Sequence, residues 1–290
     1  MKKVGKSILK QVYKPRPSRS KKYDAGILIV IGGSEFYSGS PALSAFAAFR
    51  AGVDMVHIIA PKRAADIIAS FSPLLAAYPL MGDWLTKKHL AALITLTESA
   101  KSVSGGKAAV VIGGGLGRTK ETQETILEYL SKISAPAVLD ADALHAAAKD
   151  PAVVSERPFV LTPHSYEFFL LSGQKITDFS EEKKAEMVKE EARRLKTTIL
   201  LKGEKDIISQ GEEVALNETG NPFMTVGGTG DTLAGILGAL LARGKDRFSA
   251  AQAAAYINGR AGELASKEKG ESLTPIDLIE AIPKVLLKNF

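Results

Sequence analysis

The 290-residue chain contains no cysteine. This absence excludes a thiol nucleophile, a thiolate zinc site, an iron–sulfur cluster and a disulfide framework. It is compatible with a reducing compartment, and we expect a cytoplasmic protein. A chain of this length buries roughly 75% of its unfolded surface on folding, so it needs no covalent cross-link to be stable.

Long apolar runs are also missing. No segment approaches the roughly 18–20 consecutive apolar residues of a membrane-spanning helix. The first segment, MKKVGKSILKQVYK, has no apolar stretch of the length found in secretory signals. We therefore expect neither a membrane partner nor a secretory signal.

Acidic residues are absent from the first 22 positions, which hold nine of the 38 lysines and arginines. The remaining 29 basic residues face 32 acidic ones, so the net charge of +6 comes from this arm. A basic arm can bind nucleic acid or an anionic ligand. Because aromatic residues do not interleave with the cations, we expect no nucleic-acid partner. We predict a solvated lead-in segment at 1–22 and a single domain at 23–290.

Short apolar, β-branched runs alternate with alanine-rich stretches of helical character. The expected strands are 26–31, 53–59, 108–112, 136–139, 158–161 and 198–201, with a hairpin over 206–216. The expected helices are 40–51, 61–69, 86–101, 119–132, 142–149, 165–171, 180–196, 229–243, 249–267 and 274–287. Continuous apolar strands are typical of strands buried on both faces. The alternation therefore predicts a three-layer α/β/α fold with a mainly parallel central sheet.

The alanine-rich stretch at 250–265 can pack within the chain or against a second copy. We expect a homo-oligomer.

Most of the predicted strands are followed by residues suited to a ligand. Glycines follow the strands at 26–31 and 108–112, an aspartate follows 136–139, Thr-Pro-His follows 158–161, and Lys-Gly follows 198–201. In a doubly wound sheet, ligands bind at the carboxyl ends of the strands. We therefore expect all these groups at one rim of the sheet.

The strongest individual signal is Gly227-Gly228-Thr229-Gly230-Asp231, directly before an apolar helix. Glycines let the backbone approach a ligand closely, and the free N–H groups of a helix start favour an anion such as phosphate. We expect the Thr229 hydroxyl to donate to that anion. Asp231 fits there as a base that takes a proton from a hydroxyl attacking the phosphate. Its structural alternative is a first-turn aspartate that interacts with the helix dipole.

Other rim residues have structural alternatives of similar weight. The turn Gly113–Arg118 either offers backbone amides to a ligand or is a flexible connection. Lys202 can pair with a phosphate, or 202–206 is a surface turn. Asp140 can hold Mg²⁺ through water, whereas Asp142 is expected to cap the following helix.

His164 and Glu167 are three residues apart on the same rim. His164 can donate to a polar ligand, and Glu167 can organise Mg²⁺ or water. Glu167 can instead be a first-turn residue that interacts with the helix dipole. The other histidines lack metal-ligand spacing and are expected to be structural; they are His57, His89 and His145.

Together and in this order, the motifs resemble those of the ADP/ATP-dependent NAD(P)H-hydrate dehydratases of the ribokinase-like superfamily. The resemblance runs from about Pro15 to the last helix. It rests on the segments PRPSRSKKYDAGILIVIGGS, SGSPALSAFAAFRAGVDMV, VVIGGGLGR, VLDADAL, LTPHSYEF, LLKGEKD, NETGNP and GGTGDTLAGILGALLA. It implies a ribokinase-like fold and a hydro-lyase that restores hydrated NADH or NADPH, as the S epimer, at the expense of ADP or ATP with Mg²⁺.

The resemblance also implies roles for individual residues. Asp231 is the implied catalytic base. The implied nucleotide site comprises Lys202, Gly203, Glu204, Lys205, Asp206, Asn221, Gly227, Gly228, Thr229 and Gly230. The implied contacts of the hydrated dinucleotide are Ser40, Gly115, His164, Glu167 and Asp231.

Two features differ from the family pattern. Gly114 stands where relatives often carry proline, which makes this loop more flexible. The epimerase domain often fused in front is missing, so we expect a separate epimerase as a functional partner. By association with single-domain prokaryotic forms, we expect ADP rather than ATP.

Two other functions remain open. One is a kinase of the same superfamily that phosphorylates a hydroxymethylpyrimidine or thiazole alcohol by the same Gly-Asp chemistry. The other is a non-catalytic nucleotide-sensing module, which has no use for the base at Asp231.

Overall fold

A computed structural model describes residues 1–287. Its strands form one sheet in the spatial order β1-β10-β9-β8-β7-β6-β5-β2-β3-β4. The strands are β1 (Lys2–Lys3), β2 (Ile27–Ile31), β3 (Met55–Pro61), β4 (Ala76–Leu80), β5 (Ala108–Ile112), β6 (Ala137–Leu139), β7 (Phe159–Leu161), β8 (Thr198–Leu201), β9 (Asp206–Ser209) and β10 (Val214–Asn217). Neighbouring strands are parallel except for β9, which is antiparallel to both β8 and β10. The predicted mainly parallel sheet is confirmed.

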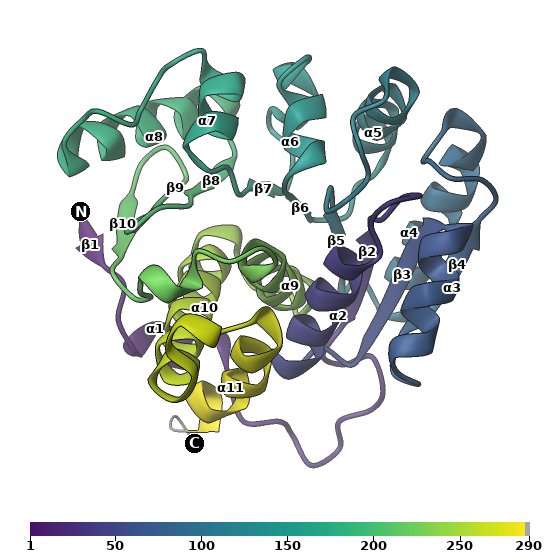
Figure 1. Cartoon of the computed structure of the whole chain (residues 1–290), viewed down its shortest axis with the longest axis horizontal. Coiled ribbons are helices and arrows are strands. Elements are labelled where there is room, and N and C mark those ends of the chain that lie inside the picture. Colours follow the sequence, from purple (N-terminus) through teal and green to yellow (C-terminus); the bar gives the residue numbers. More distant parts are fainter. Residues whose placement is uncertain (288–290) are drawn as a thin grey trace.

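Helices cover both faces of the sheet (Figure 1). One layer holds α1 (Ser7–Val12), α2 (Gly39–Arg50), α3 (Lys62–Phe71), α9 (Thr229–Ala242), α10 (Arg247–Lys269) and α11 (Pro275–Leu287). The opposite layer holds α4 (Leu90–Val103), α5 (Lys120–Lys132), α6 (Asp142–Ala147), α7 (Ser165–Ser172) and α8 (Glu181–Leu195). The short 3-10 helices are η1 (Lys87–His89), η2 (Pro151–Val154), η3 (Pro222–Met224) and η4 (Gly270–Ser272). None of the helices in residues 1–287 is both long and apolar enough to span a membrane.

The start of the chain is built into this domain, so the prediction of a solvated lead-in segment is wrong for residues 2–12. β1 pairs in parallel with β10, and α1 buries Ile8, Leu9 and Val12 in the core. The lysines of this segment lie on its exposed side. The charge pattern concealed the apolar face because the helix has only six residues and gives little periodicity.

The order of the strands creates a crevice at one end of the sheet. From β2 the chain moves outward through β3 and β4, then returns to the other side of β2 as β5. At such a switch point the connections leave the strand ends in opposite directions and open a site for a ligand. The two glycine turns that follow β2 and β5 meet there, where the Gly33 amide donates to the Gly114 carbonyl at 2.9 Å.

Helix α9 is held between the sheet and α2. A side chain at Gly235 would place its Cβ 2.1 Å from the Ser44 carbonyl oxygen of α2, and one at Gly238 would lie 2.4 Å from a methyl carbon of Val111 in β5. The absence of side chains at both positions allows this close approach, which fixes where the N-terminus of α9 lies. The alanines of α10 pack within the chain, in the same core as α9 and α11.

Most predicted elements are found within a few residues of their expected bounds, including the hairpin of β9 and β10. Beyond β1 and α1, the sequence analysis missed β4 and the short 3-10 helices η2, η3 and η4. This strand lies at the edge of the sheet, contains Pro79 and has a largely exposed face. Edge strands carry weak apolar patterns because they are not buried on both sides.

We predict that Gly235→Ala lowers the free energy of unfolding by about 1–3 kcal/mol, because the added methyl group forces α9 away from α2. Urea unfolding followed by circular dichroism measures the change. The control is Gly5→Ala, where nothing lies within 4 Å of the added Cβ. Equal stability of Gly235→Ala and wild type would show that α9 and α2 are not tightly packed.

Candidate active site

A half-buried lysine and two buried carboxylates lie near the ends of β6, β7 and β8. Lys202 Nζ lies 2.6 Å from Asp140 Oδ1 and 3.9 Å from Glu167 Oε2. Asp140 also accepts a hydrogen bond of 2.8 Å from the Thr162 hydroxyl. Each residue directly follows a strand or begins the next helix, so the parallel strands bring together groups that are far apart in the sequence.

The charges of this cluster are strongly shifted. Burial alone lowers the pKa of Lys202, but Asp140 and Glu167 more than offset this and raise it, so the lysine stays protonated. Burial raises the pKa of Glu167 to about 7, against the opposing effect of Lys202. The cluster therefore presents one permanent cation beside a carboxyl group that titrates near neutrality.

Asp231 lies in the first turn of α9, next to the glycine turn that follows β5. The Ser40 hydroxyl, at the start of α2, donates a short hydrogen bond to Asp231 Oδ1. A Cβ at Gly114 would lie 1.9 Å from Ser40 Oγ and 3.0 Å from Asp231 Oδ1. Only glycine at position 114 leaves room for the contact between Ser40 and Asp231.

The environment of Asp231 raises its pKa to about 6. Burial is the main cause, and the nearby Asp140 adds to it, while the Ser40 hydrogen bond and Lys202 act in the opposite direction. A carboxylate with this pKa is ionised at neutral pH yet accepts a proton more readily than an exposed aspartate. Such a value suits a general base.

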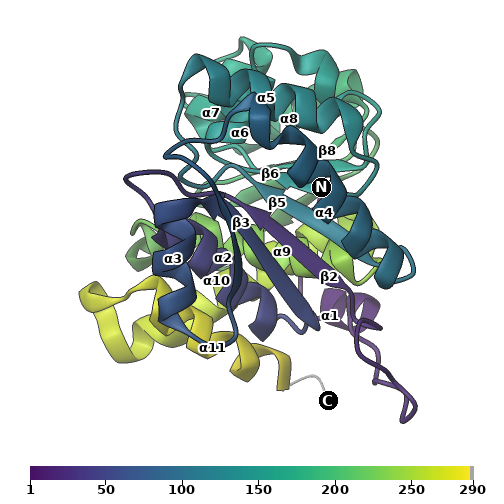
Figure 2. The ribbon, with the colours of Figure 1, turned by 90° about the vertical axis from the view of Figure 1, so that its right-hand side faces the viewer.

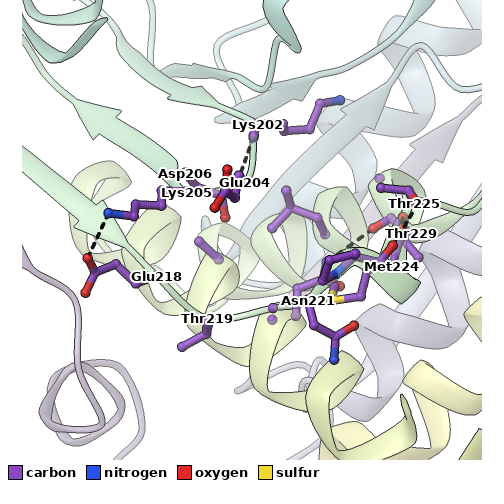
Figure 3. A pocket seen from close by; sticks show the side chains of 18 residues that line it. Lys202, Glu204, Lys205, Asp206, Glu218, Thr219, Asn221, Met224, Thr225 and Thr229 are labelled. Atoms are coloured by element: carbon purple, nitrogen blue, oxygen red, sulfur yellow. Dashed lines mark hydrogen bonds and ion pairs between the residues drawn. The ribbon is translucent and has the colours of Figure 1, made fainter. Parts of the chain in front are cut away.

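A cavity of about 810 Å³ opens beside the N-terminus of α9. Its walls come from the β8–β9 turn, the segment 218–225 and the helices α9 and α10 (Figure 3). The predicted nucleotide residues among its lining are Lys202, Gly203, Glu204, Lys205, Asp206, Asn221, Thr229 and Gly230. Gly230 adjoins the lysine cluster, since its Cβ position lies 3.8 Å from Lys202 Nζ. The volume is within the range of small-molecule and cofactor sites.

Two of the predicted nucleotide residues lie outside this lining. Gly228 caps α9 with φ of +103°, and its Cα packs against Leu43 and Pro275. Gly227 is exposed and has no atom within 4 Å of its Cβ position.

Several polar groups of the cavity bond to the protein itself. Lys205 Nζ is 2.6 Å from Glu181 and 3.3 Å from Glu218, and Figure 3 shows the second ion pair. The Thr229 hydroxyl, expected to donate to an anion, donates to the Met224 carbonyl at 2.9 Å. Asn221 accepts from the Phe223 amide and donates to Ser266, which holds the turn at 222–224 in place. The sequence did not predict these pairs, because Glu181, Glu218 and Ser266 lie far along the chain from Lys205 and Asn221.

His164 is a capping residue. Its Nδ1 accepts from the amides of Tyr166 and Glu167 at 3.2 and 3.3 Å, and the Glu167 carboxylate accepts from the His164 amide at 2.9 Å. Burial and the nearby Lys202 lower the pKa of His164, which favours the neutral ring. With Nδ1 used by the cap, Nε2 carries the proton. It lies 3.4 Å from Glu167 Oε1 and, at the exposed side of the ring, is also the group that can donate to a ligand.

Asp142 has a different role from the predicted helix cap. The residue at the cap position of α6 is Ala141, with φ of +46°. The Asp142 carboxylate instead accepts from the Gly117 amide and from Arg118 Nε, both at 2.8 Å. It thereby ties down the end of the glycine loop after β5.

Aromatic residues beside the glycine loop escaped the sequence analysis. Phe36 and Tyr37 are exposed, and the rings of Phe36 and Trp84 meet edge to face at 5.8 Å. The Cβ position of Gly115 lies 2.8 Å from Tyr37 Cβ, so Tyr37 packs directly on the loop. The available signal was the aromatic pair that immediately follows the Gly32-Gly33-Ser34 turn.

The two carboxylates expected near Mg²⁺ are Asp140 and Glu167. Within residues 1–287, no three histidine, aspartate or glutamate side chains are arranged to hold a metal ion. The predicted pair, Asp140 and Glu167, already faces the Lys202 ammonium.

A family model described as NAD(P)H-hydrate dehydratase matches residues 28–284. The chain belongs to this family. A bifunctional NAD(P)H-hydrate repair enzyme from Hyperthermus butylicus is 40% identical over 98% of this chain and 52% of its own length. An ADP-dependent (S)-NAD(P)H-hydrate dehydratase from Nitrosopumilus maritimus is 36% identical over 97% of this chain and 95% of its own length.

The same family is represented among solved structures. The ADP/ATP-dependent NAD(P)H-hydrate dehydratase of Bacillus subtilis, co-crystallised with ATP and Mg²⁺, is 27% identical, covers 99% of this chain and 98% of its own, and has a TM-score of 0.82. The predicted ribokinase-like dehydratase fold is therefore confirmed. This chain spans about half the length of several curated family members, the bifunctional repair enzymes.

We predict that Asp231→Asn stabilises the protein by about 1–3 kcal/mol at pH 7.5, because the native state raises the pKa of this buried carboxyl to about 6. The gain should shrink as the pH falls from 6 to 4, since Asp231 then becomes neutral in the native state as well. Urea unfolding of the variant and the wild type at pH 7.5 and at pH 4 measures the difference in stability. Asp66→Asn, at an exposed site on α3, is the control and should change little. A gain that does not depend on pH would exclude a shifted pKa as its cause.

We also predict that Gly114→Ala costs about 1–3 kcal/mol of stability, because the new methyl group collides with Ser40. The double variant Ser40→Gly/Gly114→Ala should recover much of this loss. Urea unfolding of the two single variants and the double variant gives the coupling. Strictly additive losses would contradict a direct contact between positions 40 and 114.

Proposed function

We propose that the chain is an ADP-dependent (S)-NAD(P)H-hydrate dehydratase, which removes water from NADH or NADPH hydrated on the nicotinamide ring. Family membership and the named activity of the N. maritimus relative support this proposal. The observation that carries it is the position of Asp231, a buried carboxyl group with a pKa of about 6. It lies between the nucleotide-sized cavity and the glycine turn after β5.

In this proposal the nucleotide occupies the 810 Å³ cavity, with its terminal phosphoryl group at the start of α9. The first amides of α9 face that group, and the helix dipole favours its negative charge. Lys202 supplies a protonated ammonium at the same end of the cavity. Glu167 is itself partly protonated near pH 7, so it competes only partly with a phosphate for this ammonium.

The hydrated ring occupies the other side of Asp231, along the glycine loop at Gly115. The exposed rings of Phe36 and Tyr37 offer apolar faces for a planar ring system there. His164, through Nε2, donates to a polar substituent. Ser40 acts as a positioning residue, since its hydroxyl holds one oxygen of Asp231.

The reaction then follows from the role of Asp231. Its carboxylate takes the proton of the ring hydroxyl, whose oxygen forms a bond to the terminal phosphorus while the bond from that phosphorus to the departing nucleotide breaks. The phosphate ester is a better leaving group than hydroxide. The lone pair of the ring nitrogen expels it as phosphate, and loss of a proton from the adjacent ring carbon restores the reduced nicotinamide. The energy of the nucleotide thus drives the dehydration.

Mg²⁺ enters this proposal only as a companion of the nucleotide phosphates, as in the co-crystal of the B. subtilis relative. No step is assigned to it. The R epimer of the hydrate is expected to need a separate epimerase activity before it becomes a substrate.

We predict that wild-type protein restores the absorbance of reduced nicotinamide from hydrated NADH and ADP, releasing one AMP and one phosphate per NADH. Asp231→Ala should lower kcat by about 10²–10⁴-fold, because the general base is lost. The rate of the wild type should fall below pH 6, since Asp231 accepts a proton only when ionised. Ser40→Ala should move this midpoint to higher pH, because the Ser40 hydrogen bond lowers the pKa of Asp231. A spectrophotometric assay of NADH formation, with analysis of the released nucleotide, measures the products, kcat and the pH midpoints of wild type and Ser40→Ala.

The control is Asp66→Asn, which should keep full activity. Turnover of Asp231→Ala near the wild-type rate, with normal folding, would show that the base is another group. Accumulation of a stable phosphorylated alcohol without formation of NADH would identify a kinase instead. Binding of the nucleotide without any turnover would indicate a sensing module.

A further inference from the structure

A second, strongly basic cavity lies at the other end of α9. It has a volume of about 340 Å³ and is bounded by the loop between α1 and β2, by the residue before β5 and by the segment after α9. Its charged lining residues are Lys14, Arg16, Lys107, Arg243, Lys245 and Asp24. Figure 2 shows the loop between α1 and β2 extending from the main body of the molecule near the start of β2. Asp231 is in the first turn of α9 and Arg243 follows its last residue, so the helix of about 21 Å separates this cavity from the candidate active site.

Few acidic groups balance these five cations. Arg16 pairs with Asp54 at 2.9 Å. Lys107 donates to the backbone carbonyl of Asp24 at 2.9 Å, while the Asp24 carboxylate accepts from the Lys21 amide. In the part of the chain that the structure describes, neither Lys14 nor Lys245 has an ion-pair partner.

Arg243 is held in place without a carboxylate. Its Nη1 donates to the Gly52 carbonyl at 2.7 Å, and its guanidinium lies 4.9 Å from the centre of the Tyr13 ring. Its Nε is buried and has no hydrogen-bond partner. One donor of a fixed, half-buried guanidinium is therefore left unsatisfied.

The cations also repel one another. Burial lowers the pKa of Lys245, and Arg243, Lys14 and Lys107 each lower it further. Burial likewise lowers the pKa of Arg243, and Arg16 adds to this effect. Such an arrangement costs energy unless an anion enters the cavity.

Two simpler explanations account for only part of this arrangement. Cations after the end of α9 interact favourably with its dipole, which explains Arg243 and Lys245. It does not explain Lys14 and Lys107, which come from other segments. A nucleic-acid surface would offer aromatic rings for stacking, but the Tyr13 ring is covered by Arg243.

We propose that this cavity is a binding site for a small anion carrying two linked phosphoryl groups, with inorganic pyrophosphate as its simplest form. The cavity is near the lower limit of volume for ligand sites, which suits a compact anion. Lys14, Lys107 and Lys245 contact the phosphoryl oxygens as point charges, and the guanidinium of Arg16 donates to them in its plane. The site is separate from the candidate active site, so this inference does not depend on the proposed function.

Titration calorimetry and thermal unfolding with pyrophosphate test the proposal, using the full chain at constant ionic strength. The wild type should bind pyrophosphate and gain roughly 2 °C or more in Tm near saturation. Lys14→Gln/Lys245→Gln should weaken this binding about tenfold or more, because it removes two of the five cations. Lys202→Gln, which alters only the candidate active site, should leave it unchanged. The matched control Lys120→Gln/Lys267→Gln removes two exposed lysines elsewhere and should also have no effect.

A second measurement needs no ligand. At low salt, Lys14→Gln/Lys245→Gln should unfold at a higher temperature than wild type, because the repulsion around Lys245 is relieved. If the double variant fails to fold, Lys14→Gln alone provides the same comparison from an exposed position. Methyl diphosphate is titrated in place of pyrophosphate to identify the source of the phosphoryl groups. Equal affinity for the two would indicate an esterified diphosphate as the ligand, whereas much weaker binding of methyl diphosphate would indicate free pyrophosphate.

Loss of pyrophosphate binding in Lys202→Gln alone would overturn the proposal, since the anion would then occupy the candidate active site. Equal affinity of Lys14→Gln/Lys245→Gln and wild type would do the same. Tight binding of a single-stranded RNA without binding of pyrophosphate would replace the small anion with nucleic acid.

Discussion

The close packing of α9 against its neighbours sets the geometry of the candidate active site. Gly235 lets α9 approach α2, so the two helix starts that carry Asp231 and Ser40 meet. Gly114, in the turn after β5, has no side chain that would collide with Ser40 or Asp231. The pair exists because three backbone segments come closer together than side chains would allow. The chemistry of Asp231 thus depends on packing at some distance from it.

Burial gives the charged groups of the candidate active site different protonation behaviour. Asp231 and Glu167 both have raised pKa values, of about 6 and about 7, because few solvent molecules reach them. Lys202 is half-buried, but its carboxylate neighbours keep it protonated. One region therefore provides a cation that persists and a carboxylate able to accept a proton near neutral pH. A rim of exposed residues with the same composition would provide neither.

Sequence reasoning succeeded for residues whose placement follows from local patterns and failed for those whose partners are distant. The glycine-rich start of α9 was recognised from its glycines directly before an apolar helix, and the Lys-Gly turn because it follows a buried strand. Asp142 was mistaken for a helix cap, because its partners Gly117 and Arg118 lie in another loop. The basic start of the chain was taken as solvated, because six residues of α1 show no clear apolar face.

The alternation of apolar strands and helices determined the α/β layers, and the order of the motifs determined the family. Both are encoded locally, in hydrophobic period and in turn residues. Tertiary structure alone decided that Ser40 reaches Asp231, that Thr229 bonds to its own loop, and that cations from three segments surround one cavity. These contacts join residues far apart in the chain, and their distances are fixed by packing that no local pattern records.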